Sequence, residues 1–127
     1  MAITGIGIDV VEVERIRALL ERHGERFKER TFTEVEARYC DACADPAMHY
    51  AARFAAKEAG AKALGTGFAK GVNWADIEVT RDAAGRPELS LHGAARVLAE
   101  QQGVVRYHVS LTHTKQQAVA QVLMESM

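Results

Sequence analysis

Apolar residues alternate with glycine and polar residues near the start of the chain. In residues 5–10 every second position is Ile or Val, which is the period of a strand with one buried face. Gly5, Gly7 and Asp9 stand between them, so the carboxylate shares a face with two positions that carry no side chain. Such a face gives room to a ligand or to another backbone, and glycines in a strand can equally mark a bulge.

The pattern then changes to the helical period, and residues 12–30 predict one continuous helix. Arg15, Arg22 and Arg26 fall on one line along this helix. Residues 15–30 hold six Arg or Lys against three Glu. This basic stripe suits an acidic partner, although a charged helix face can also be simply solvated.

Two more helices follow in the first half of the chain. Thr33 and Glu36 have the spacing of a capping box, which predicts a helix to about Cys43. Pro46 then precedes an alanine-rich helix from Met48 to Leu64, and Gly65 has the place of a left-handed C-cap. Gly60 within that helix costs about 1 kcal/mol relative to alanine unless close packing compensates.

The second half of the chain predicts strands joined by turns. Alternating apolar residues flank the turn-forming segment 82–87, which indicates a hairpin. A short helix over 93–102 follows, and then strands over 104–112 and 118–124 joined by a loop at 114–117. Strands and helices mix without regular alternation, which favours an α+β fold in which antiparallel hairpins pack against helices.

Length and composition limit the classes of protein that fit. A chain of 127 residues predicts one compact domain spanning 1–127. The 48% hydrophobic content excludes a disordered protein, and 16 basic against 17 acidic residues exclude a protein that coats nucleic acid. No apolar run reaches the roughly 18 residues of a membrane span, and the N-terminus lacks a secretory signal, so we expect a cytoplasmic protein.

Cys40 and Cys43 have the C-x-x-C spacing of some zinc and redox sites. Zinc needs about four ligands, and the chain has no second cysteine pair. Both residues also lie one turn apart within a predicted helix. We therefore expect two half-buried thiols with a structural role.

Glu58 and Lys62 stand four positions apart on the third helix, which is the spacing of a common surface ion pair. Their helix face also carries Ala51 and Phe54, which indicates that it turns toward the protein. Inward charges need partners, and Asp9 is the available one. Two carboxylates can hold Mg²⁺ and leave coordination positions for water and phosphate.

The last strands contain a second group of polar residues. Alternation places His108, Ser110 and Thr112 on one face, which suits binding of phosphate or ribose, although a wet polar face is the simpler interpretation. His113 at the strand end has no evident role. The segment Gly65-Thr66-Gly67 follows a helix, so a C-cap and turn is favoured over a backbone nest for phosphate.

These segments occur in a fixed order that resembles the holo-[acyl-carrier-protein] synthase family, the small trimeric 4'-phosphopantetheinyl transferases. The resemblance rests on GIGIDVVEVERI at 5–16, RFAAKEA at 53–59, KALGTG at 62–67 and HVSLTH at 108–113, with DIEV at 76–79 and GRP at 85–87. Gly60 departs from the family pattern, which often has alanine or a bulkier residue there.

The resemblance implies transfer of 4'-phosphopantetheine from coenzyme A to a serine of apo acyl carrier protein, with release of adenosine 3',5'-bisphosphate, in fatty acid biosynthesis. It implies a homotrimer whose active sites lie between subunits. The implied roles are magnesium ligands for Asp9 and Glu58, a contact with the transferred phosphate for Lys62, nucleotide contacts for His108 and Gly65, Thr66 and Gly67, and carrier contacts for Arg15, Arg22 and Arg26.

The serine hydroxyl needs a base, and both Glu58 and a metal-bound water held by Asp9 fit that role. Two other classes of protein keep part of the pattern. A catalytically silent module would bind coenzyme A or a nucleotide without forming product, and an interaction protein would use only the basic stripe. The presence of Asp9, Glu58 and Lys62 in one chain favours the enzyme.

Overall fold

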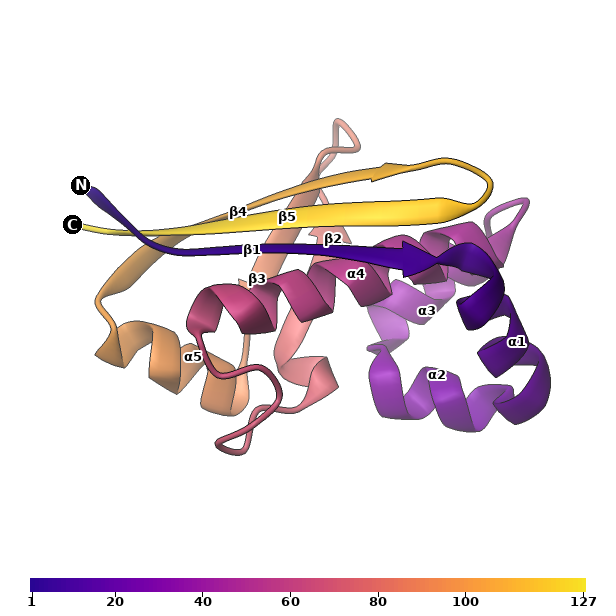
Figure 1. Cartoon of the computed structure of the whole chain (residues 1–127), viewed down its shortest axis with the longest axis horizontal. Helices are drawn as coiled ribbons and strands as arrows, with labels where there is room; N and C mark the ends of the chain where they lie inside the picture. The colour runs from indigo at the N-terminus through magenta and orange to yellow at the C-terminus, as the bar shows by residue number, and fades with distance from the viewer.

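A three-stranded antiparallel sheet runs along the length of the molecule in the computed structural model, which describes residues 1–127 (Figure 1). Its strand order is β1-β5-β4, and a second antiparallel sheet consists of β2 and β3. The elements in chain order are β1 (Ala2–Glu12), α1 (Val13–His23), α2 (Glu25–Thr31), α3 (Glu34–Asp41), α4 (Pro46–Leu64), the 3-10 turn η1 (Trp74–Asp76), β2 (Ile77–Arg81), β3 (Pro87–Leu91), α5 (Gly93–Gln101), β4 (Val104–His113) and β5 (Gln117–Ser126). The predicted α+β class with antiparallel hairpins is confirmed.

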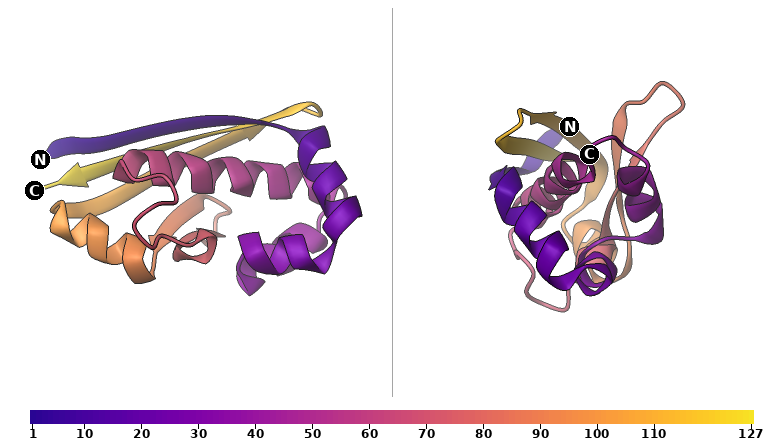
Figure 2. Two further views of the ribbon diagram at one scale, coloured as in Figure 1. Left: turned by 60° about the horizontal axis from the view of Figure 1, so that its bottom comes forward. Right: turned by 90° about the vertical axis from the view of Figure 1, so that its right-hand side faces the viewer.

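Helix α4 packs directly on one face of the long sheet (Figures 1 and 2). The two glycines of β1 allow this contact, because a Cβ on Gly5 would lie 2.0 Å from the Ala63 carbonyl oxygen and one on Gly7 would lie 1.8 Å from that of Ala59. Any side chain there would push the helix off the sheet. The close backbone approach is therefore confirmed, and a register shift between Ile3 and Gly5 shows that β1 also contains an irregularity.

The opposite face of β1 corrects one expectation. Ile6, Ile8 and Val10 were expected on a buried face, yet they are 57%, 58% and 57% exposed in the single chain. The alternation itself is as predicted, but the glycine side of the strand faces α4 and the isoleucine side faces outward. The outer face of β1 is therefore apolar.

The first predicted helix is also corrected. Gly24 has a φ of +52° and separates α1 from α2, which lie at an angle to each other (Figure 2). Glycine adopts this φ at little cost, so the chain turns there and the helical pattern continues in a new direction. The basic stripe is consequently divided between two helices.

The other helix signals behave as predicted, except that α3 ends at Asp41, so Cys43 lies beyond the helix. Of the two thiols expected to be half-buried, Cys40 is fully buried and Cys43 is half-buried. Thr33 and Glu36 form a capping box at the start of α3, and Gly65 ends α4 with a φ of +82°. Helix α4 begins at Pro46, two residues before the predicted start. A Cβ on Gly60 would lie 3.0 Å from Cγ2 of Ile77, so close packing against β2 accounts for this glycine.

The core lies between α4, the inner face of the long sheet and the β2–β3 hairpin. It contains buried alanines of α4 together with Ile77, Val122 and Met124. None of the helices has the length and hydrophobicity that crossing a bilayer would require.

Candidate active site

Asp9, Glu58 and Lys62 come together where α4 crosses β1. Lys62 Nζ donates to Asp9 Oδ1 at 3.0 Å and to the backbone carbonyl of Ile8 at 2.9 Å. The Asp9 side chain is 18% exposed and that of Lys62 is 51% exposed. The pair lies beside a shallow pocket of about 260 Å³ lined by Ile8, Asp9, Val10, Lys62 and Val119. The expected partnership of Lys62 with Asp9 is confirmed, but the Lys62 side chain is exposed at the edge of the helix rather than turned inward.

Glu58 completes this group with excess negative charge. Partial burial raises the pKa of its carboxyl, and the nearby charge of Asp9 raises that pKa further, whereas Lys62 and Arg15 oppose the shift. No side chain donates a hydrogen bond to the Glu58 carboxylate in this structure. Two carboxylates in this situation are stabilised by a bound cation.

The oxygen donors of Asp9 and Glu58 fit Mg²⁺, which prefers such ligands and retains several waters. The chain brings no group of three or more acidic, His or Cys side chains together as a metal site. Any remaining ligands would therefore be water or substrate oxygens.

The segment Gly65-Thr66-Gly67 continues directly from Lys62 at the end of α4. The Gly65 N–H donates to the Lys62 carbonyl at 2.9 Å, and the Gly67 N–H donates to that of Ala61 at 3.1 Å. Both amides therefore complete the helix end, and the Thr66 hydroxyl donates to the Gly67 carbonyl. The C-cap interpretation is confirmed, and these two amides are not free to form a phosphate nest.

His108 lies away from the carboxylates. It is opposite Leu123 in the β4–β5 register, and Asp9 is opposite Ala120 on the other side of β5. Alternation along β5 then places His108 on the outer face of the sheet and Asp9 on the inner face. The His108 Nε2 lies 2.9 Å from Glu125 Oε2. Within one chain, His108 does not join Asp9, Glu58 and Lys62.

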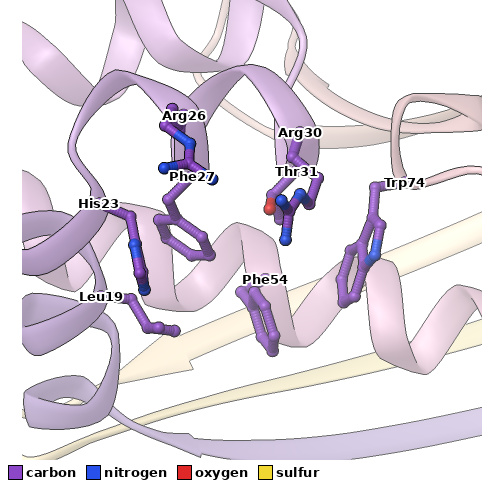
Figure 3. Close-up of a pocket in the computed structure, with 8 residues that line it drawn as sticks. All are labelled: Leu19, His23, Arg26, Phe27, Arg30, Thr31, Phe54 and Trp74. Atoms are coloured by element: carbon purple, nitrogen blue, oxygen red, sulfur yellow. The ribbon is translucent and has the colours of Figure 1, made fainter.

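An apolar groove rimmed by basic residues lies between α1, α2, α4 and η1. We call it the basic groove; it has a volume of about 380 Å³ and is lined by Leu19, His23, Arg26, Phe27, Arg30, Thr31, Phe54 and Trp74 (Figure 3). Phe54 lies between Phe27 and Trp74 in the close-up. Of the predicted stripe, Arg26 lines the groove, Arg15 lies over the Phe54 ring at 5.3 Å, and Arg22 is exposed outside the lining.

A second group of basic residues surrounds a smaller pocket that sequence reasoning missed. We call it the cationic pocket; it has a volume of about 170 Å³ and is lined by Tyr39, His49, Ala52, Arg53, Arg81, Gly85, Pro87, Leu111 and His113. Its lining contains no carboxylate. The available signals were Arg53 at the start of the third-helix motif and Gly85 before Pro87, but nothing in the spacing placed them together.

The charges of the cationic pocket lack internal compensation. Arg53 is only 4% exposed, and its Nε is the one buried side-chain polar atom without a hydrogen-bond partner. The Arg53 and Arg81 guanidinium carbons lie 4.3 and 4.8 Å from the Tyr39 ring centre, which gives cation–π contacts but no counter-charge. The Arg53 guanidinium therefore lacks both a counter-charge and a full set of acceptors, and an anion in the pocket would supply the counter-charge.

Burial lowers the pKa of His49 in this pocket, and the charges of Arg53 and His113 lower it further. The two histidine rings lie 5.5 Å apart in an edge-on arrangement. Gly85, with a φ of +87°, lets Arg81 approach, since a Cβ there would lie 2.7 Å from an Arg81 terminal nitrogen.

Comparisons with known proteins agree over nearly the whole chain. Residues 5–122 match the 4'-phosphopantetheinyl transferase superfamily. The holo-[acyl-carrier-protein] synthase of Koribacter versatilis is 50% identical over 123 residues, which cover 97% of this chain and 98% of the relative. That of Solibacter usitatus is 46% identical over 98% of this chain and 99% of the relative.

Solved structures show similarity to the same family. Holo-[acyl-carrier-protein] synthase from Neisseria meningitidis superposes with a TM-score of 0.90 at 36% identity, covering 98% of this chain and 100% of that one. The Bacillus anthracis protein in complex with CoA (3',5'-ADP) has a TM-score of 0.81 at 39% identity, covering 98% of each chain. The chain therefore belongs to the 4'-phosphopantetheinyl transferase superfamily and is a transferase of the holo-[acyl-carrier-protein] synthase family.

Proposed function

We propose that this chain transfers 4'-phosphopantetheine from coenzyme A to a serine of apo acyl carrier protein and releases adenosine 3',5'-bisphosphate, with Mg²⁺ as cofactor. The observation that carries the proposal is the cluster of Asp9, Glu58 and Lys62 at the crossing of β1 and α4. The names of the relatives support the reaction, and the B. anthracis structure supports coenzyme A as donor.

The chain's own residues supply binding, orientation and a proton acceptor. Asp9 and Glu58 would hold the metal, which neutralises charge on the pyrophosphate when bound. Lys62 uses two of its three N–H donors on Asp9 and Ile8, so the third is available to the transferring phosphoryl group. Catalysis of this kind depends mostly on positioning and electrostatics.

The bond changes follow from the two substrates. The serine oxygen forms a bond to the phosphorus that carries the pantetheine, and the bond from that phosphorus to the bridging oxygen breaks with release of adenosine 3',5'-bisphosphate. The serine proton goes to the Glu58 carboxylate. A water held at Asp9 is the alternative acceptor.

The cationic pocket suits the 3'-phosphate of coenzyme A. A phosphate monoester carries close to two negative charges and three acceptor oxygens, and the pocket offers Arg53, Arg81 and two histidines without a carboxylate. The Arg53 guanidinium would gain the counter-charge that it lacks. His108 and the segment 65–67 remain proposed nucleotide contacts, and His108 would have to serve the site of a neighbouring subunit.

We also propose that the chain forms a homotrimer with active sites between subunits. Ile3, Ile6, Ile8 and Val10 are each more than half exposed on the outer face of the long sheet. A contiguous apolar surface of this kind marks a protein interface. His108 lies on the same face, so trimer formation would bring it toward another chain.

Replacing Ile6 by glutamate is expected to dissociate the trimer, because a carboxylate would be buried in the apolar interface. Light scattering coupled to size exclusion should show the wild type at three times the chain mass and Ile6→Glu at the chain mass. Val97→Glu on α5 is the control, since Val97 is 54% exposed elsewhere, and it should stay trimeric. An Ile6→Glu protein that keeps the wild-type mass would contradict the assigned interface.

The basic groove is the proposed docking site for the carrier protein. Arg26 lines an apolar depression formed by Phe27, Phe54 and Trp74, and Arg15 lies over the Phe54 ring. Arg22 is the third proposed carrier contact and is exposed on α1 outside the lining. Positive charge around an apolar centre suits an acidic helical partner that brings one or two apolar side chains.

Reversing the charge at Arg26 is expected to raise the KM for carrier protein about tenfold or more and to leave the KM for coenzyme A within about twofold. Steady-state kinetics with each substrate varied in turn measures both values. Arg96→Glu on α5, at the other end of the molecule from α1 and α2 (Figure 1), changes the net charge equally and should change neither KM. Equal increases in both KM values for Arg26→Glu would reject docking in the groove.

Incubating the protein with coenzyme A, Mg²⁺ and apo acyl carrier protein tests the proposed activity directly. The carrier protein should gain the mass of one phosphopantetheine. An unchanged carrier mass would favour a catalytically silent coenzyme A-binding module or an interaction protein.

The acceptor named in the relatives supports a place in fatty acid biosynthesis, and two free cysteines fit the reducing cytoplasm.

A further inference from the structure

We propose that His49 is a proton-coupled phosphate ligand, which gains a proton when the 3'-phosphate of coenzyme A enters the cationic pocket. The inference rests on the proposed function of that pocket. It adds that the affinity for coenzyme A increases as pH falls, and that this chain's own His49 is responsible. His49 lines the pocket and stands one turn before Arg53 on α4, so the imidazole and the guanidinium project from the same helix face.

The surroundings of His49 favour its neutral form in the free protein. Four elements contribute the groups that face it: Arg53 on α4, Arg81 on β2, His113 on β4, Tyr39 on α3 and Asp45 at the start of α4. Asp45 is the only acidic group among them, and it is already engaged by Arg17 at 3.1 and 3.2 Å. An imidazolium at this place would be a further positive charge among unpaired cations.

A bound phosphate reverses this balance. A dianion between Arg53, Arg81 and the histidines would favour the protonated imidazole, because the nearest charge would then be opposite in sign. The pKa of His49 is lowered in the free protein and would rise on binding. At any pH between the free-state and bound-state pKa, His49 therefore takes up a proton when the phosphate binds. Linkage then requires stronger binding at lower pH, by up to about tenfold per pH unit for one fully coupled proton.

The phosphate itself titrates near pH 6 and would release protons on entering a cationic site. The total proton count for coenzyme A therefore combines two opposite contributions. Replacing His49 by glutamine removes only the histidine contribution, because the ligand is unchanged. The difference between the two proteins isolates His49.

Isothermal titration calorimetry of the full chain with coenzyme A, in buffers of different ionisation enthalpy, measures the number of protons taken up. We expect wild type to take up about half a proton to one proton more than His49→Gln near pH 7. As the pH is lowered from 8 to 6.5, the dissociation constant of wild type for coenzyme A should also fall more steeply than that of His49→Gln. His92→Gln is the matched control, since His92 pairs with Glu78 outside the pocket, and it should behave as wild type.

Dephospho-coenzyme A, which lacks the 3'-phosphate, distinguishes the role of His49 from the proposed phosphate site on which it rests. If wild type binds coenzyme A much more tightly than dephospho-coenzyme A, but His49→Gln keeps the same proton uptake and pH dependence, the role of His49 is overturned and the phosphate pocket stands. If His113→Gln loses the extra proton uptake and His49→Gln does not, the role of His49 is overturned as well. If wild type binds both ligands equally, the pocket assignment fails together with this inference, while the carrier mass assay still tests the transferase activity independently.

Discussion

Replacing Glu58 by glutamine is expected to abolish phosphopantetheine transfer and, without Mg²⁺ at neutral pH, to stabilise the folded protein. The loss of activity follows because the variant removes a proposed metal ligand and the candidate base together. The gain in stability follows because burial and the charge of Asp9 both disfavour the Glu58 carboxylate. Glutamine has a similar shape and removes that charge.

The sign of the pH dependence follows from the raised pKa of Glu58. Below the ordinary pKa of 4.5, Glu58 is protonated in both the folded and the unfolded state and costs nothing. As pH rises through the raised folded-state pKa, the unfolded state gains the charge more readily and the folded state loses stability. The advantage of Glu58→Gln should therefore be absent at acidic pH and present at neutral pH.

Thermal unfolding at several Mg²⁺ concentrations gives a measure that does not depend on activity. Mg²⁺ should raise the Tm of wild type, since it binds only the folded carboxylate pair, and should leave that of Glu58→Gln nearly unchanged. Glu88→Gln on β3 is the control and should respond as wild type. Near-normal transfer by Glu58→Gln, or an equal Mg²⁺ response in both proteins, would contradict the assigned role.

The helices and strands follow closely from local signals. The capping box at Thr33 and the C-cap at Gly65 depend on residues a few positions apart, which the sequence displays directly. Gly24 was missed as a break because the apolar period continues on both sides of it. A periodic pattern reports the face of a helix but not a change in its direction.

The inner and outer faces of β1 illustrate a different limit. Alternation separates Ile6 and Ile8 from Gly7 and Asp9, yet it does not say which set faces the core. The alanine-rich surface of α4 requires the glycine set, and the isoleucine set is left outside. We propose that the isoleucine set meets a neighbouring subunit. Hydrophobicity alone cannot distinguish residues that face the core from residues that face a partner.

The candidate site was predictable only in part. One helix spacing and one strand period predicted that Asp9, Glu58 and Lys62 lie close together, and in the structure these three groups interact. The cationic pocket collects residues from α3, α4, β2 and β4. Its charges are far apart in the sequence, and no local pattern contains the tertiary packing that joins them.

A buried ion pair connects the elements that line the basic groove and the cationic pocket. Lys57 and Glu36 have fully buried side chains and lie 2.7 Å apart. Lys57 also donates to the carbonyls of Trp74 and Ile77 at 2.9 and 2.7 Å. Glu36 accepts from the N–H groups of Thr33 and Val79, each at 2.8 Å. Burial lowers the pKa of Lys57, and Glu36 opposes that shift.

Replacing Lys57 by methionine is therefore expected to lower the free energy of unfolding by about 3–5 kcal/mol, because the variant leaves the Glu36 carboxylate buried without its counter-charge. Urea unfolding at one fixed protein concentration measures the change. Arg96→Met breaks an exposed pair with Glu100 and should change the free energy of unfolding by less than about 1 kcal/mol.

The double variant Lys57→Met/Glu36→Gln tests whether the stranded charge is the cause. Glutamine is neutral and still offers an oxygen to the Thr33 or Val79 N–H, so the double variant should be more stable than Lys57→Met alone. The double variant could instead lose as much free energy of unfolding as Lys57→Met and Glu36→Gln lose together. That result would show that the hydrogen bonds to Trp74 and Ile77 dominate. Since Trp74 lines the basic groove and Thr33 caps the helix that carries Tyr39, the loss of this pair should loosen both pockets before the long sheet unfolds.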